Sequence, residues 1–341
     1  MTRVAVIGVG SMGKNHVRVY SEMPNVELVA VVDANPELAN RIGHAYHVPA
    51  YQDYFEMVDH TKPEAVSIAV PTSLHYQVAK DILELGCHVI VEKPIASTAE
   101  QAQYLVSLAD QLGVILMVGH IERYNPAIIE LKRRLDQNEL GHIFQIHARR
   151  LGPFPTRIQD VGVIMDLAPH DLDIMRYLTG QEVTRVHAET ERILHETQDD
   201  MFAGLVRFEN GILGVLEINW LTPTKIRELY VTGERGMFRV DYITQDLCFY
   251  ENAETNGDRW STISLLRGVS EGMIIRYPIK KKEPLRAELE AFISSVQGKS
   301  LFKGNGYDAQ VALELVSALI QASTDGTANQ VNYLLKPEMS V

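Results

Sequence analysis

The chain has little cysteine and no motif built on it. Its 341 residues include two cysteines, Cys87 and Cys248, which lie far apart in apolar, strand-like segments. This count excludes a disulfide-rich secreted scaffold and offers no cysteine spacing for a structural zinc site. We interpret both residues as small core side chains in a reducing compartment, and we predict no metal.

Long apolar runs and excess positive charge are also absent. No run of 18 apolar residues occurs, so no segment is expected to span a membrane. The apolar start of the chain lacks a small-residue cleavage site and is not interpreted as a signal peptide. A net charge of −12 disfavours nucleic acid as a partner. We expect a cytoplasmic protein that binds a small molecule, which can be anionic because a cleft can be locally positive.

What the sequence does contain is an ordinary globular composition, 46% apolar, and enough length for two domains. Short apolar strands are predicted at Arg3–Ile7, Val26–Asp33, Ala65–Val70, His88–Val91 and Val114–Val118. The segments between them show helical spacing, with capping signals at Asn35-Pro36 and at Ser97–Gln101. This alternation predicts a doubly wound parallel sheet.

After about residue 119 the pattern changes to hairpins. Strands are predicted at Ile143–Arg149, Thr184–Glu191, Phe202–Phe208, Ile212–Trp220, Glu228–Thr232 and Met237–Tyr242. Helices are expected at Asp166–Leu178, Pro284–Val296 and Tyr307–Ala322, and Asn252–Glu283 is interpreted as loop and edge strand. Turn signals such as Asn210-Gly211 join the strands, so a second, α+β domain with a mostly antiparallel sheet is predicted.

Gly8, Gly10 and Gly13 form a Gly-x-Gly-x-x-Gly motif between the first strand and the first helix. The first glycine permits the turn, the second lets the backbone approach a pyrophosphate, and the third lets helix and strand pack closely. The helix N-terminus favours the phosphates. We therefore predict a dinucleotide site that includes Ser11 and Met12, with a purely structural turn as the alternative.

Asp33 ends the second strand, where a carboxylate would bind a ribose 2′-hydroxyl. A carboxylate repels a 2′-phosphate, and the next residues, Ala34 and Asn35, offer no cation, so NAD is favoured over NADP. The alternative interpretation of Asp33 is a helix-capping residue.

Further candidates follow two other predicted strands. Glu92 and Lys93 precede Pro94 after the strand His88–Val91. In a doubly wound sheet ligands bind at the carboxyl ends of strands. This position favours a functional Lys93 over a solvated surface lysine, and we assign Glu92 to the cofactor. Pro71, Thr72 and His75 follow the Ala65–Val70 strand and are also predicted to line the cofactor groove.

Asp166 and His170 are spaced by four residues, and Asp173 follows one turn later on the same predicted helix face. An aspartate can orient an imidazole so that it acts as a base at neutral pH. The alternatives are a capping aspartate with a buried histidine, or a metal site. The other histidines, His16 among them, show no pattern.

Arg123, Tyr124 and Asn125 follow the last strand of the first predicted domain. Clefts often form at domain junctions, so Arg123 could bind a diphosphate and Tyr124 could stack on a sugar or base. We assign all three to the substrate. Junction packing is the alternative.

The motifs together resemble one family in chain order. GVGSMG with Asp33, AVPTSLH, EKP, RYNP, DLAPHDLD and a C-terminal ALELVSALIQAS are similar to the glucose–fructose oxidoreductase and inositol dehydrogenase family, Gfo/Idh/MocA. One departure is Ala168-Pro169, since many members have glycine two residues after the aspartate, and a different helix entry is therefore expected. The stretch VGHIERYNPA resembles the branch of UDP-N-acetylglucosamine 3-dehydrogenases.

The resemblance implies a Rossmann domain, placed at residues 1–121, and an α+β domain for substrate binding and oligomerisation, placed at residues 122–341. It implies an open antiparallel sheet with helices on one face, and a homo-oligomer. It implies that Lys93, Asp166 and His170 are the catalytic residues, with Lys93 and His170 also touching substrate. The expected reaction is NAD-dependent oxidation of a sugar hydroxyl. A myo-inositol or other polyol dehydrogenase and a non-catalytic NAD-binding regulator are the alternatives.

Overall fold

The computed structural model describes residues 1–155, 162–253, 271–299 and 306–334. The chain forms two compact units. Unit 1 contains Met1–Tyr124, Glu283–Glu314 and the chain end from Tyr333. Unit 2 contains Asn125–Lys282 and Leu315–Asn332. Each unit is built around its own sheet.

Unit 1 is built on a six-stranded parallel sheet in the order β3-β2-β1-β4-β5-β6. Its strands are β1 (Thr2–Ile7), β2 (Val26–Val32), β3 (Ala50–Tyr51), β4 (Ala65–Ile68), β5 (His88–Val91) and β6 (Leu116–Val118). Every residue of β4 is buried, as expected for a strand covered on both faces. The predicted doubly wound sheet is confirmed, and its order reverses between β1 and β4.

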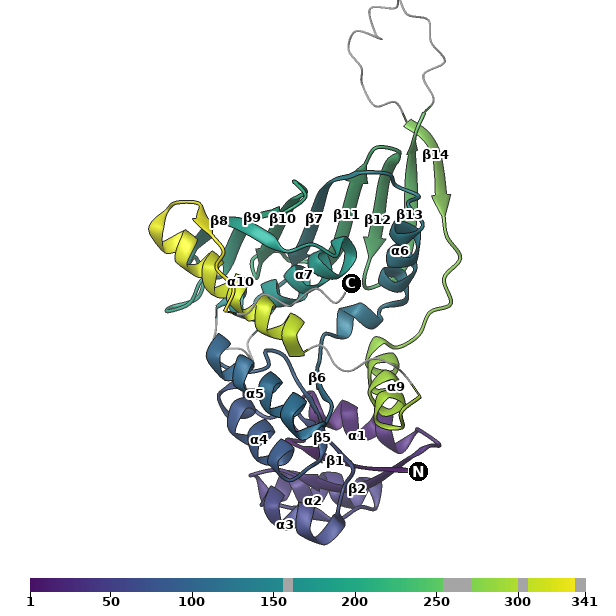
Figure 1. Cartoon of the computed structure of the whole chain (residues 1–341), viewed down its shortest axis with the longest axis vertical. Helices are drawn as coiled ribbons and strands as arrows, with labels where there is room; N and C mark the ends of the chain where they lie inside the picture. Colours follow the sequence, from purple (N-terminus) through teal and green to yellow (C-terminus); the bar gives the residue numbers. More distant parts are fainter. Residues whose placement is uncertain (156–161, 254–270, 300–305, 335–341) are drawn as a thin grey trace, which may run out of the picture. The chain divides into compact units, whose positions relative to one another are not determined.

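Helices cover both faces of this sheet. They are α1 (Gly13–Ser21), α2 (Pro36–Tyr46), α3 (Tyr54–Thr61), α4 (Thr72–Glu84), α5 (Ala99–Leu112) and α9 (Pro284–Val296). Figure 1 shows α1 and α9 on one side of the strands and α4 and α5 on the other. The predicted caps are confirmed, because Asn35 accepts N–H groups of α2 and Thr98 accepts one of α5.

The predicted division of the chain at residues 121 and 122 omits the return of α9 to unit 1. Leu285, Leu289 and Phe292 are buried in the cluster that also contains Val17 and Tyr20 of α1. These positions form one apolar face at helical spacing, which the sequence shows. The sequence pattern does not predict which unit this face of α9 packs against, because it could be buried against any apolar surface.

Unit 2 is built on a nine-stranded sheet in the order β14-β13-β12-β11-β7-β10-β9-β8-β15. Its strands are β7 (Ile143–Leu151), β8 (Val183–Glu191), β9 (Met201–Phe208), β10 (Leu213–Asn219), β11 (Ile226–Gly233), β12 (Gly236–Asp241), β13 (Asp246–Asn252), β14 (Glu271–Arg276) and β15 (Asn329–Gln330). The β7–β10 pair is parallel and the other pairs are antiparallel. The prediction of a mostly antiparallel sheet is confirmed, and β14 supplies the expected edge strand.

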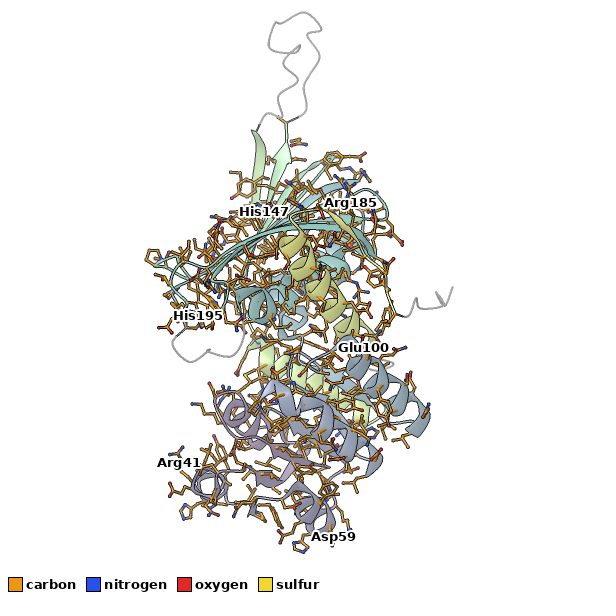
Figure 2. All side chains as sticks on the ribbon, turned by 90° about the vertical axis from the view of Figure 1, so that its left-hand side faces the viewer. Arg41, Asp59, Glu100, His147, Arg185 and His195 are labelled. Carbon is orange, nitrogen blue, oxygen red and sulfur yellow. The ribbon has the colours of Figure 1, made fainter. Side chains whose placement is uncertain are left out.

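Two helices of unit 2 bear on the site: α6 (Pro126–Asp136) and α7 (Val163–Thr179). A third, α10 (Gly306–Asp325), runs from unit 1 into unit 2. On β7 the buried residues Ile146, Ala148 and Arg150 alternate with the more exposed His147 and Arg149. In Figure 2, His147 and Arg185 lie on the sheet face away from the helices. Among the residues that the structure describes, helices cover one face of the sheet, and the face that carries His147 and Arg149 is more exposed.

In the part of the chain that the structure describes, no helix is both long and apolar enough to cross a membrane.

Candidate active site

The glycine loop joins β1 to α1 and is held tightly at two of its three glycines. Gly8 has φ of +82°, and a Cβ there would lie 2.6 Å from the carbonyl oxygen of Ala69, which follows β4. A Cβ on Gly13 would lie 1.7 Å from the carbonyl oxygen of Gly8. Both positions need glycine because of the protein's own packing.

Gly10 is different, because a Cβ there would meet no atom within 4 Å among the described residues beyond its two neighbours in the chain. The space above the middle glycine is open, and the N-terminus of α1 follows it. This is the cradle that a pyrophosphate requires, since close backbone approach and a helix N-terminus both favour phosphate. The residues present therefore fit NAD, whose pyrophosphate would lie against Gly10, Ser11 and Met12.

Asp33 lies at the end of β2, directly beside this loop. One carboxylate oxygen accepts the N–H of Val9 at 2.9 Å, and the other accepts the N–H of Asn35 at 2.9 Å. The cap of α2 is Asn35, not Asp33, so the helix-cap interpretation of Asp33 is wrong. The carboxylate is fixed at the strand end next to the glycine loop, where ribose hydroxyls would be recognised.

The segment after β4 brings Pro71 and Thr72 to the same edge. Pro71 precedes α4, and Thr72 is its first residue. His75 lies one turn further on and is 1% exposed. Its ring contacts two backbone carbonyls, Nδ1 with Pro94 at 2.6 Å and Nε2 with Val70 at 2.9 Å. His75 therefore lies between two loops of the cofactor edge, and its neutral ring can donate a hydrogen bond to only one of the two carbonyls.

Glu92 and Lys93 follow β5, and the Lys93–Pro94 peptide is cis. The Glu92 side chain is 14% exposed, and its Oε1 lies 3.0 Å from Nε2 of His16. Burial raises the pKa of Glu92, but the hydrogen bond from His16 and the positive charge of Lys93 outweigh it, so the net pKa is lowered. Glu92 is thus a largely covered carboxylate directly before Lys93.

In unit 2, α7 carries the predicted acid–base pair. The helix begins at Val163, three residues before the predicted start, and continues through Pro169. Asp166 and His170 are partly exposed and lie one turn apart, whereas Asp173, predicted on the same face, is 1% exposed. Asp166 and His170 therefore differ from Asp173 in being partly exposed on α7.

An ion pair fixes α7 against the sheet. Nε of Arg150 lies 2.8 Å from one oxygen of Asp171, and its second terminal nitrogen lies 2.9 Å from the other oxygen. Both side chains are buried. Because a buried pair of this geometry tolerates little displacement, it holds the turn of helix that contains His170.

The residues predicted to bind substrate at the domain junction have structural partners. Asn125 caps α6 through its oxygen and donates its amide to the carbonyl of Tyr242, so we no longer assign it to the substrate. Tyr124 packs against the core of unit 1. Arg123 lies 2.8 Å from Asp308. Arg123 therefore has a carboxylate partner within unit 1.

Among the residues that the structure describes, no three His, Cys, Asp or Glu side chains are grouped as a metal ion would need. Within unit 1, the glycine loop, Asp33, Thr72 and Glu92 follow β1, β2, β4 and β5 at one sheet edge. The fold and this edge define a class, the NAD-binding Rossmann oxidoreductases that carry a second, antiparallel-sheet unit.

Known proteins narrow the class further. Residues 2–120 match the oxidoreductase family model with an NAD-binding Rossmann fold, and residues 128–239 match the Gfo/Idh/MocA C-terminal domain. UDP-N-acetylglucosamine 3-dehydrogenase of Acidithiobacillus ferrooxidans is 30% identical, covering 86% of this chain and 88% of that protein. The chain belongs to the Gfo/Idh/MocA family of NAD-dependent oxidoreductases.

Two further likenesses bear on specificity. An NAD⁺-dependent scyllo-inositol 2-dehydrogenase of Bacillus subtilis is also 30% identical, covering 97% of this chain and 96% of that protein. The solved structure of the Acidithiobacillus enzyme superposes with a TM-score of 0.83 at 28% identity, covering 94% and 96% of the two chains. One nucleotide-sugar dehydrogenase and one inositol dehydrogenase thus share the same sequence identity, 30%, with this chain.

Proposed function

We propose that this protein oxidises a secondary hydroxyl of a sugar or polyol ring, with the C3 hydroxyl of UDP-N-acetylglucosamine as the first candidate. One observation carries the acid–base part of the proposal: α7 presents Asp166 and His170 one turn apart and partly exposed, while the neighbouring Asp171 and Asp173 are buried. Similarity to UDP-N-acetylglucosamine 3-dehydrogenase over most of the chain supports the substrate.

In this proposal three side chains divide the work. Oxidation removes the hydroxyl proton and the hydrogen on the same carbon, and bound NAD⁺ supplies the hydride acceptor. His170 accepts the hydroxyl proton, and Asp166 orients its ring and stabilises its protonated form. The Lys93 ammonium stabilises the charge that grows on the oxygen as the proton leaves. In the alternative assignment, Lys93 accepts the proton and His170 holds the hydroxyl.

An inositol or other phosphate-free polyol is the second candidate, and the arginines favour it. Arg149 lies 2.7 Å from Glu217, Arg150 is paired with Asp171, and Arg123 with Asp308. Alternation along β7 also places Arg149 and Arg150 on opposite faces of the sheet. These groups have carboxylate partners within the chain, so they do not require a substrate diphosphate to balance their charge.

The proposal extends to a cytoplasmic homo-oligomer, a dimer or tetramer, in which residues 122–341 bind substrate and form the interface. The more exposed face of the nine-stranded sheet, which carries His147 and Arg149, is available for such an interface. Light scattering coupled to size exclusion tests the assembly, and a monomer at micromolar concentration would contradict it.

Initial rates of NADH formation test the substrate. The panel contains UDP-N-acetylglucosamine, its uronic acid, UDP-glucose, myo-inositol, scyllo-inositol, glucose and free N-acetylglucosamine, each with NAD⁺ and NADP⁺. An aminotransferase that consumes a 3-keto sugar is added in parallel, because that oxidation can be uphill. Turnover with UDP-sugars alone supports the first candidate, and turnover with a free polyol supports the second.

Replacing His170 tests the base. We expect His170→Ala to lower kcat by roughly 10²–10⁴-fold, the range for a lost general base, while NADH binding measured by fluorescence stays unchanged. His187→Ala, on β8, is a matched control and should keep normal turnover. Normal turnover of the His170 variant would remove it from the mechanism.

A further inference from the structure

We propose that His16 and His75 are positioning residues for Lys93, His16 by holding the residue before it and His75 by holding the residue after it. The inference rests on the proposed role of Lys93 in the reaction. Both histidines belong to unit 1, and each is 1% exposed. Neither ring is open to solvent, so each acts through the groups it contacts.

His16 lies on α1 and contacts the sheet at two points. Its Nδ1 lies 2.6 Å from the hydroxyl oxygen of Ser67 on β4, and its Nε2 lies 3.0 Å from Oε1 of Glu92. Because a carboxylate only accepts, Nε2 carries a proton and donates it to Glu92. In the neutral ring Nδ1 then accepts from the Ser67 hydroxyl, which fixes both the tautomer and the ring orientation.

Glu92 is also confined from its other side. A Cβ on Gly119 would lie 3.2 Å from a Glu92 carboxylate oxygen, so that carboxylate is packed against backbone beyond β6. The backbone N–H of Glu92 continues the sheet by donating to Ile68 at 2.9 Å. Side chain and backbone of the residue before Lys93 are therefore both fixed.

His75 acts on the other side of Lys93. Burial lowers the pKa of His75, so its ring is neutral and donates through one nitrogen only. We assign the proton to Nδ1, because its contact with the Pro94 carbonyl, at 2.6 Å, is shorter than the 2.9 Å contact of Nε2 with Val70. Since α4 is packed on the sheet, the ring connects the loop beyond β5 to a rigid element. Lys93 thus lies between two residues that buried histidines of α1 and α4 hold.

This arrangement has a chemical purpose. An ammonium group that stabilises a developing alkoxide must be held to within a fraction of an ångström, and small displacements far from the reacting atoms reduce rates substantially. A lysine side chain is flexible, so its backbone has to be rigid for the amine to be placed reproducibly. The two histidines supply that rigidity without touching the substrate.

Amide substitutions separate the two contacts of each ring. The asparagine amide nitrogen is as many bonds from Cα as Nδ1, and the glutamine nitrogen as many as Nε2. His16→Gln keeps the donor to Glu92, and His16→Asn loses it. His75→Asn keeps the donor to Pro94, and His75→Gln loses it. His44→Asn and His44→Gln, at an exposed position of α2, are the controls.

We expect opposite preferences at the two positions. His16→Asn and His75→Gln should lower kcat roughly 10- to 100-fold with little change in the NADH dissociation constant, and their amide partners should recover most of the rate. In a Lys93→Met background the same substitutions should change the residual rate by less than about twofold, since residues acting as one unit are not additive. Equal losses for Asn and Gln, or full additivity with Lys93→Met, would overturn the proposal.

A second measurement does not depend on turnover. Hydrogen exchange of the segment 92–97 should become faster in His16→Asn and His75→Gln than in the wild type and in the rescuing variants. If exchange responds but no substrate turns over, the proposed function fails while the positioning contacts stand. If His16→Asn does not fold, Glu92→Met replaces it, because methionine removes the carboxylate acceptor for His16, and unchanged kcat and exchange in that variant overturn the inference.

Discussion

Single residues at the cofactor edge have different roles, although the three glycines look equivalent in the Gly-x-Gly-x-x-Gly motif. Gly8 and Gly13 are required by backbone that a Cβ would strike, whereas Gly10 has open space above it. The Asp33 carboxylate holds the glycine loop by accepting the N–H of Val9, and its negative charge lies at the end of β2. Packing and ligand recognition can therefore be separated by choosing which residue to change.

The Asp33 charge should set cofactor choice. We expect Asp33→Ala to weaken NADH binding and to relax discrimination against NADPH, because the carboxylate no longer repels a 2′-phosphate. Asp33→Asn is the sharper variant, since its amide oxygen can still accept one of the two backbone N–H groups. Dissociation constants for NADH and NADPH, with melting temperatures, distinguish the two effects. If Asp33→Asn still excludes NADPH, the charge is not the determinant.

The sequence predicts the residues of this edge only where the interacting residues are close together in the chain. The glycine spacing and Asp33 could be identified because the chemistry lies within one strand–turn–helix unit. His16 gives no such signal: its partners Ser67 and Glu92 are 51 and 76 positions away, and only the folded sheet brings them together. His75 was placed at the correct edge, but its burial could not be inferred from sequence.

At the scale of elements, α7 depends on a neighbouring loop as well as on Arg150. The N–H of Val163, which begins the helix, donates to the carbonyl of Asp199 at 2.9 Å. The adjacent Asp200 is fully buried, and its carboxylate accepts N–H groups of Ile193, Leu194 and His195. One carboxylate thus orders the loop to which the first residue of α7 is hydrogen-bonded.

This carboxylate should make stability depend on pH. Burial raises the pKa of Asp200, but its backbone hydrogen bonds lower it more, and the net pKa is below the ordinary value. The stabilisation is therefore present above the unfolded pKa near 4, and it is lost as pH falls through the lower folded pKa. Asp200→Asn should cost about 2 kcal/mol at neutral pH and reduce the loss in acid, measured by urea unfolding at several pH values.

Asp199→Asn is the matched control for that experiment. Burial raises the pKa of Asp199, with Asp200 and Glu191 adding to the effect, so its ionised form is disfavoured in the folded state. Removing this charge should leave stability at neutral pH unchanged or slightly higher. Equal destabilisation by the two substitutions would contradict the assignment of the loop to Asp200.

Three of the elements that the sequence does not predict are α6, β3 and β13. Asn125-Pro126 carries the same cap signal as Asn35-Pro36, yet the position after the last Rossmann strand led us to assign Asn125 to substrate, and α6 was not predicted. The two residues of β3 are too few to show an alternation, and the apolar centre of β13, which contains Cys248, is strand-like but has no alternation that would give its bounds. Long, strongly patterned elements such as α9 were predicted to the residue.

On the scale of the whole molecule, the NAD-binding unit is completed by residues far along the chain. Phe292 of α9 is fully buried in the core of unit 1. We expect Phe292→Ala to cost about 3–5 kcal/mol and to lower the midpoint of NADH release on heating. Glu290→Ala, on the more exposed face of the helix, should stay within about 0.5 kcal/mol of wild type. An unaffected NADH-release midpoint in the Phe292 variant would contradict this contribution of α9.

The late position of α9 also has a consequence for synthesis on the ribosome. The first 124 residues emerge well before residue 296, the end of α9, and at roughly 5–20 residues per second the interval is about 10–35 s. During that interval the apolar surface formed by Val17 and its neighbours on α1 lacks its cover. The nascent cofactor unit therefore exposes this part of its core throughout the interval, and it acquires its full core after most of unit 2 has been translated.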